Sequence, residues 1–101
     1  MTEKSVLKLG LIGTGFMGRA HAFAFTLAPR VFELPVEVRL EAVADVDAEA
    51  AEAARRRLGF ARAFTDWRAM IEAVDVVDIT APNALHEEMA LTAIAAGKAV
   101  Y

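Results

Sequence analysis

Apolar and polar residues alternate in short blocks along the chain, and the blocks predict strands and helices in turn. Residues 6–12 form a short apolar run that ends at a glycine, which is typical of a buried strand. Residues 16–27 predict a helix, and we expect Pro29 to stop it. Val36–Ala44 alternates apolar and polar residues before becoming uniformly apolar, which indicates a strand that enters the middle of a sheet.

The middle of the chain carries clear helix-end signals. Residues 47–58 are rich in alanine and predict a helix, with Asp47 as the N-cap and Gly59 at the C-terminal end. Two shorter elements follow, a strand at 61–64 and a helix at 66–73 with Thr65 or Asp66 as its cap.

The last third of the chain repeats the alternation. Residues 74–80 are largely β-branched and predict a strand. Pro82 then breaks the chain, and Asn83 can cap a helix that runs to Ala96. A last strand begins at Lys98.

Because crossover helices separate the strands, the strands must be mostly parallel, with helices on both faces. The pattern therefore predicts an α/β fold with a doubly wound, mostly parallel sheet. No linker or internal repeat divides the sequence, so residues 1–101 form a single predicted domain.

Composition and charge narrow the possible functions. A net charge of −3 argues against a nucleic acid or an anionic membrane as partner, because both attract basic surfaces. The basic run at 55–57 lies in a predicted helix and is assigned to a solvated face. With no cysteine, the chain has no disulfide, thiolate metal site or cysteine nucleophile, and we expect no metal. It also lacks a signal peptide or membrane span, so the expectation is a soluble, cytoplasmic protein.

The string GTGFMG follows the first predicted strand and opens the first predicted helix. Gly13 can make the tight turn, Gly15 lets the backbone approach a pyrophosphate, and Gly18 allows close packing of helix on strand. The helix N-terminus would then face the phosphates. The alternative is a merely flexible turn between strand and helix. The predicted loop comprises Gly13, Thr14, Gly15, Phe16, Met17 and Gly18.

Asp45 stands at the predicted end of the second strand, where a carboxylate can accept hydrogen bonds from the adenosine ribose. A carboxylate there would repel a 2′-phosphate, which favours NAD over NADP. Asp45 lies further from the last glycine than the usual ~20 residues, and the segment 29–35 accounts for the extra length. The alternative is an ordinary turn residue. Asp47 is assigned as a helix cap, not a ligand.

The segment from Thr80 to Asn83 leaves the carboxyl end of the strand at 74–80, on the side of the sheet where doubly wound folds bind ligands. Thr80 and Pro82 form the turn, and Asn83 and His86 could face the nicotinamide ribose or the substrate. From the residues alone, the favoured interpretation of Asn83 is a helix cap, and that of His86 is a partly exposed residue of the first helical turn.

Two other ring side chains are assigned no catalytic role. His21, on the first helix, is interpreted as packed or solvated, and Trp67 as a packing residue.

Three segments together resemble the Gfo/Idh/MocA oxidoreductases, a family that includes glucose-fructose oxidoreductase and inositol dehydrogenase. They are GLIGTGFMGRAHAFAF, VADVD and DVVDITAPNALHEEMALTAIAAGKAVY, and they cover nearly all of the chain. The resemblance implies an N-terminal Rossmann domain, with the three loop glycines at the pyrophosphate and Asp45 at the ribose. Pro82, Asn83 and His86 match a segment that lines the nicotinamide pocket. The longer stretch at 29–35 departs from the family pattern.

By the same resemblance, the catalytic lysine lies in a Glu-Lys-Pro motif just beyond Tyr101. The α+β domain that holds the substrate and commonly forms the oligomer interface would follow it. We therefore expect a chain truncated before that domain and inactive by itself. The implied parent is a homo-oligomeric enzyme that moves a hydride between NAD and a secondary alcohol or ketone, on a sugar or cyclitol.

A rival function of another class is a non-catalytic nucleotide-sensing or interaction domain that uses the same pocket only to bind. Whether the gene continues past Tyr101 into the Glu-Lys-Pro segment separates the two. A flavodoxin-like or receiver-type domain is disfavoured, because neither explains the glycine spacing.

Overall fold

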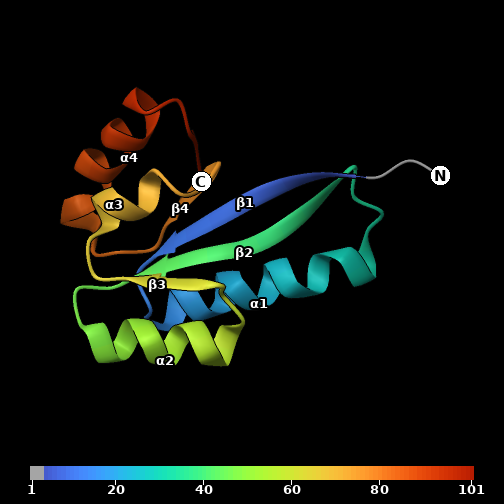
Figure 1. Cartoon of the computed structure of the whole chain (residues 1–101), viewed down its shortest axis with the longest axis horizontal. Coiled ribbons are helices and arrows are strands. Elements are labelled where there is room, and N and C mark those ends of the chain that lie inside the picture. Colours follow the sequence, from blue (N-terminus) through green and yellow to red (C-terminus); the bar gives the residue numbers. More distant parts are fainter. Residues whose placement is uncertain (1–3) are drawn as a thin grey trace.

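The computed structural model describes residues 4–101, so the first three positions of the predicted domain lie outside the described residues. Five strands form one parallel sheet in the order β3-β2-β1-β4-β5 (Figure 1). The order reverses between β1 and β4, which is the switch point where such sheets bind ligands. The predicted doubly wound fold is confirmed. The strands are β1 (Ser5–Ile12), β2 (Val36–Ala44), β3 (Arg62–Phe64), β4 (Val76–Ile79) and β5 (Ala99–Val100).

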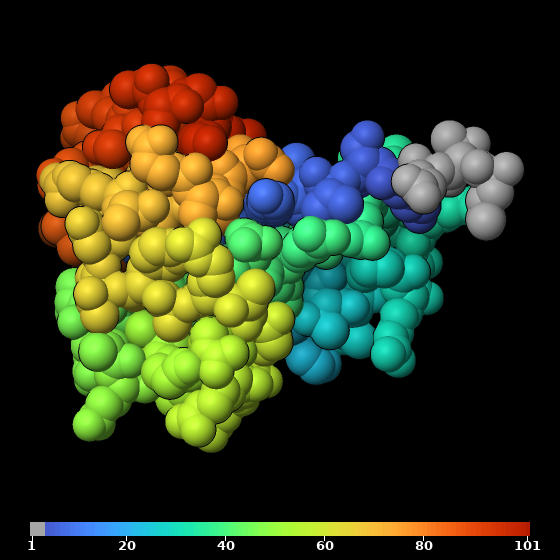
Figure 2. Space-filling view, viewed as in Figure 1, coloured from blue at the N-terminus to red at the C-terminus, as the bar shows by residue number. Residues whose placement is uncertain are grey.

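The first two helices of the chain cover one face of the sheet, and the next two cover the other face (Figure 1). On one face lie α1 (Phe16–Val31) and α2 (Ala48–Leu58), and on the other lie α3 (Trp67–Ile71) and α4 (His86–Ala95). A short 3₁₀ turn, η1 (Asn83–Leu85), precedes α4. The long ends of β1 and β2 extend away from α3 and α4, with α1 beside them (Figures 1 and 2).

Neighbouring residues of the central strands belong to two separate apolar clusters, because successive side chains of a strand point to opposite faces. Leu11 and Val43 belong to the cluster with Ala22 of α1 and Ala54 of α2. Ile12 belongs to the cluster on the other face. The uniformly apolar ends of β1 and β2 therefore mark strands that are covered on both sides.

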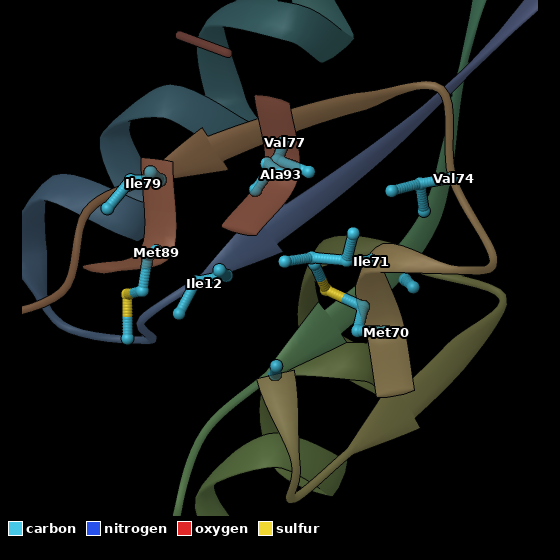
Figure 3. Packing of buried hydrophobic residues seen from close by; sticks show 10 residues of the cluster. Ile12, Met70, Ile71, Val74, Val77, Ile79, Met89 and Ala93 are labelled. Atoms are coloured by element: carbon cyan, nitrogen blue, oxygen red, sulfur yellow. The ribbon is translucent and has the colours of Figure 1, made fainter. Parts of the chain in front are cut away.

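Side chains of α3 and α4 pack in the larger cluster, as Figure 3 shows. Met70 and Ile71 come from α3, and Met89 and Ala93 from α4; all four are buried. Full burial of a methionine or isoleucine side chain contributes roughly 1.5–3 kcal/mol. Such contacts hold α3 in place although it spans only 5 residues, too few to be stable alone.

The first helix is longer than predicted. It continues through Pro29 to Val31 instead of stopping before the proline. Pro29 falls in the last turn, where its missing N–H removes one helical hydrogen bond and few residues remain to be disturbed. The Phe32 N–H then donates to the Ala28 carbonyl and ends the helix.

Two of the three predicted caps are confirmed. The Asp47 carboxylate accepts the Glu49 N–H at 3.0 Å, and Asp66, not Thr65, accepts the Arg68 N–H at 3.0 Å. Both bonds occupy amide groups that a helix start leaves without partners.

Asn83 does not cap α4. It lies inside η1, and α4 begins only at His86. The Leu85 N–H donates to the Pro82 carbonyl at 3.0 Å, so the backbone of the 3₁₀ turn leads into the helix without a side-chain cap.

Within residues 4–101, no helix has the length and apolar character needed to cross a membrane.

Candidate functional site

The loop between β1 and α1 is bound tightly to the ends of two neighbouring strands. Gly13 has φ +104°, a conformation that favours glycine, and its N–H donates to the Ala44 carbonyl of β2 at 2.9 Å. On the other side, the Thr80 hydroxyl donates to the carbonyls of Ile12 at 2.8 Å and Gly13 at 3.2 Å. The Thr80 side chain therefore ties the start of the loop to the end of β4.

The other two glycines of the loop differ in their surroundings. A Cβ on Gly18 would lie 2.2 Å from the Gly13 carbonyl oxygen, so only glycine lets the helix approach the strand this closely. A Cβ on Gly15 would meet no atom within 4 Å, so this backbone faces open space.

Gly15 is also the N-cap of α1 and supplies no side chain to its first amide groups. The side chains of Phe16 and Met17 are 75% and 54% exposed. The start of α1 thus presents backbone N–H groups and the positive end of the helix dipole beside an open glycine, as anion-binding loops do.

Asp45 directly follows β2 and lies beside the loop. The Thr14 hydroxyl donates to its Oδ2 at 2.6 Å, and the Asp47 N–H donates to its Oδ1 at 2.9 Å. Each carboxylate oxygen keeps lone-pair capacity for a further donor. The structure therefore brings the predicted ribose acid and the predicted phosphate loop together through Thr14.

A groove of about 170 Å³ opens at the carboxyl ends of the strands. Gly13, Asp45 and Pro82 are the predicted site residues in its lining. The other eight lining residues were not predicted as site residues. Five of them end a strand or follow one within two residues, which is the signal that could have found them. The eight are Ile12, Ala44, Val46, Thr65, Trp67, Ala81, Leu85 and Met89.

Asn83 and His86 are not part of this lining, although both follow the turn at Pro82. Asn83 is exposed. His86 is half-buried, and its Nε2 donates to the Ala81 carbonyl, which ties the start of α4 to the turn after β4. This bond leaves Nδ1 as the other hydrogen-bonding atom of the ring.

A buried carboxylate that was not predicted lies on β4, on the face opposite the larger apolar cluster. Asp78 is 0% exposed, and His21 Nδ1 donates to it at 2.8 Å. Burial raises the pKa of the Asp78 carboxyl above its ordinary 3.8, while the hydrogen bond and charge of His21 oppose that rise. The signal was an aspartate in the middle of a β-branched run. His21, expected to be packed or solvated, is part-buried and bonded to this carboxylate.

Trp67 combines the predicted packing role with a place in the groove. Its half-buried ring packs against the larger cluster, and the Arg68 guanidinium lies 4.2 Å from the ring centroid.

Sequence comparison agrees with this geometry. Residues 7–101 match a family model described as "Oxidoreductase family, NAD-binding Rossmann fold", the Gfo/Idh/MocA family. The chain belongs to this family. The resemblance inferred from the glycine loop and the segment after β4 is thereby confirmed.

Among curated Gfo/Idh/MocA relatives, a levoglucosan dehydrogenase from Pseudarthrobacter phenanthrenivorans is 45% identical over an alignment of 98 residues that covers 91% of this chain. An inositol 2-dehydrogenase from Paracoccus denitrificans is 38% identical over an alignment of 95 residues, with the same coverage of this chain. The chain spans 24% and 26% of these two relatives, or about a quarter of their length.

Solved structures of the family superpose closely. An NAD-binding oxidoreductase from Klebsiella pneumoniae has a TM-score of 0.89 and 51% identity, with 94% of this chain and 26% of that chain covered. Levoglucosan dehydrogenase in complex with NADH and levoglucosan has a TM-score of 0.92 and 41% identity, covering 95% of this chain and 27% of that one.

Proposed function

We propose that this chain binds NAD(H) at the carboxyl edge of β1, β2 and β4, as the cofactor domain of a dehydrogenase for sugars or cyclitols. The observation that carries the proposal is the open glycine at the start of α1 beside the carboxylate of Asp45. Family membership and the levoglucosan and inositol dehydrogenases among the relatives support the substrate class.

The glycine loop fits a pyrophosphate. Gly15 leaves room for the phosphates to reach the backbone, and the amide groups of Phe16, Met17 and Gly18 begin the helix there. Hydrogen bonds from N–H groups to a charged partner contribute roughly 1.5–3 kcal/mol each. We assign pyrophosphate binding to residues 13–18.

Asp45 fits a ribose diol, because each of its oxygens can still accept a hydrogen bond. Its negative charge opposes a 2′-phosphate, so we propose a preference for NAD over NADP. The groove beside it is lined mainly by apolar side chains, among them Val46, Trp67 and Leu85, and suits the flat adenine ring, whose faces can pack against apolar groups.

Thr80, Pro82, Asn83 and His86 continue the proposed site toward the nicotinamide. When bound, the nicotinamide ring supplies the hydride chemistry, and the protein supplies position and charge. Thr80 fixes the loop, and His86 fixes the turn after β4, which leaves the exposed Asn83 amide free to meet the cofactor or the substrate.

We propose the reaction for a protein of the relatives' length. Its substrate is a secondary alcohol or ketone of a sugar or cyclitol, and its cofactor partner is NAD. Residues 4–101 would act there by binding and orienting the dinucleotide.

Calorimetric titration with NADH tests the proposal on the 101-residue chain. We expect saturable, one-to-one binding that Gly15→Val abolishes. Wild-type protein that shows no heat of binding at millimolar NADH, while remaining folded by circular dichroism, would overturn the proposal.

A further inference from the structure

Thr14 occupies the second position of the glycine loop, where its side chain has a specific partner. Its hydroxyl donates to Asp45 Oδ2 at 2.6 Å, a distance typical of charge-assisted O–H···O⁻ hydrogen bonds. Since the hydroxyl hydrogen points to the carboxylate, it is not directed at the phosphates that the loop would bind.

The Asp45 carboxylate is held from two sides. Thr14 binds Oδ2 from the end of β1, and the Asp47 N–H binds Oδ1 at 2.9 Å from the start of α2. Of these two donors, the Asp47 amide belongs to the backbone of the same turn. Among residues 4–101, only Thr14 donates to this carboxylate from a side chain and from another element, so this contact can be removed by a side-chain change.

We propose that Thr14 is a positioning residue that sets the preference for NAD over NADP by fixing the orientation of the Asp45 carboxylate. This inference rests on the proposed function. A carboxylate that is already oriented loses little side-chain freedom when a ribose diol binds. The same fixed charge cannot turn away from a 2′-phosphate. Thr14 therefore raises NADH affinity and penalises NADPH.

Thr80 offers a contrast within the same loop. Its hydroxyl holds the carbonyls of Ile12 and Gly13, on the pyrophosphate side that both cofactors share. Loss of the Thr80 hydroxyl should weaken NADH and NADPH binding equally, whereas loss of the Thr14 hydroxyl should change their ratio.

The binding test uses calorimetry with NADH and NADPH on three variants of the 101-residue chain. Thr14→Val should raise the Kd for NADH about tenfold and lower the Kd for NADPH, by less than about twofold. Thr14→Ser retains the hydroxyl and should keep the wild-type ratio. Thr26→Val is the matched control, because the Thr26 hydroxyl donates to the Ala22 carbonyl within α1, about two helical turns after the loop.

A second measurement needs no cofactor. If Thr14 orients Asp45, Thr14→Val should speed hydrogen exchange of the Asp47 amide several-fold, because its acceptor oxygen becomes mobile. Thr14→Ser and Thr26→Val should leave that exchange rate unchanged. In an Asp45→Ala background, Thr14→Val should have no further effect on the cofactor ratio.

The results separate the possible failures. Equal weakening of NADH and NADPH by Thr14→Val would overturn the specificity claim and make Thr14 a support of the loop like Thr80. Unchanged Asp47 exchange would overturn the positioning claim. Wild-type protein that binds neither cofactor would overturn the proposed function, while the exchange rate would still decide whether Thr14 orients Asp45.

Discussion

Gly15 and Gly18 belong to the same motif, but the structure predicts opposite consequences for their substitution. Gly15 has φ −75° and ψ −165°, extended backbone that any residue adopts, and nothing lies within 4 Å of an added Cβ. Valine is a poorer N-cap than glycine, so Gly15→Val should cost below about 1 kcal/mol of unfolding free energy. The valine side chain would nevertheless stand where a pyrophosphate must approach. Loss of two N–H bonds to phosphate, at roughly 1.5–3 kcal/mol each, weakens binding about 100-fold or more.

Gly18→Ala should instead damage the fold. The new methyl would lie 2.2 Å from the Gly13 carbonyl oxygen, a backbone atom that also accepts the Thr80 hydroxyl. Overpacking of this kind costs roughly 1–3 kcal/mol, and loss of the hydrogen bond adds about 1 kcal/mol. The better helix propensity of alanine returns about 1 kcal/mol, which leaves a net loss of roughly 2 kcal/mol.

Thermal melting and NADH titration of both variants check this reasoning. We expect the melting temperature of Gly18→Ala to fall by roughly 8–16 °C, and that of Gly15→Val by only a few degrees with NADH binding lost. NADH binding by Gly15→Val within about a factor of two of wild type would refute the assigned role of the loop. Unchanged melting of Gly18→Ala would refute the close approach of α1 to β1.

The remaining predictions concern charge, cofactor choice and association. Asp45→Ala should lessen the preference for NADH over NADPH without unfolding the domain; tighter NADPH binding by the wild type would contradict the Asp45 assignment. Burial raises the folded-state pKa of Asp78, so the unfolding free energy of the wild type, relative to Asp78→Asn, should fall as pH rises from about 4 and level off above that pKa. A flat difference curve from urea unfolding at several pH values would contradict this. Tyr101 is 70% exposed beside the short edge strand β5, so the 101-residue chain should self-associate; light scattering of a strict monomer at high concentration would refute it.

The fold was predictable because the central strands end in apolar residues and because glycine, proline and acidic residues mark where strands and helices begin or end. The ends of β2 and the cap at Asp47 follow from local residues alone. The error at Pro29 arose because a proline in the final turn of a helix removes only one hydrogen bond. The error at Asn83 arose because a 3₁₀ turn, which no local residue signalled, precedes α4.

The candidate site could be predicted as far as its residues belong to a motif. Glycine spacing pointed to the loop, and a position at the end of the second strand pointed to Asp45. Neither signal could reveal that Thr14 joins them, because that bond links positions 31 residues apart. The pair formed by His21 and Asp78 is separated by 57 residues and was missed for the same reason. Trp67 illustrates a further limit, because one side chain both packs in the core and lines the groove.

The most direct test of the central claim is an NMR titration of the ¹⁵N-labelled 101-residue chain with NADH. Our account predicts that the largest amide shifts fall on residues 13–18, on Asp45 and Val46, and on the turn from Thr80 to Asn83, all at one edge of the sheet. Shifts confined to other surfaces, such as the hollow lined by Ala24, Phe25 and Tyr101, or no shifts at saturating NADH, would contradict it.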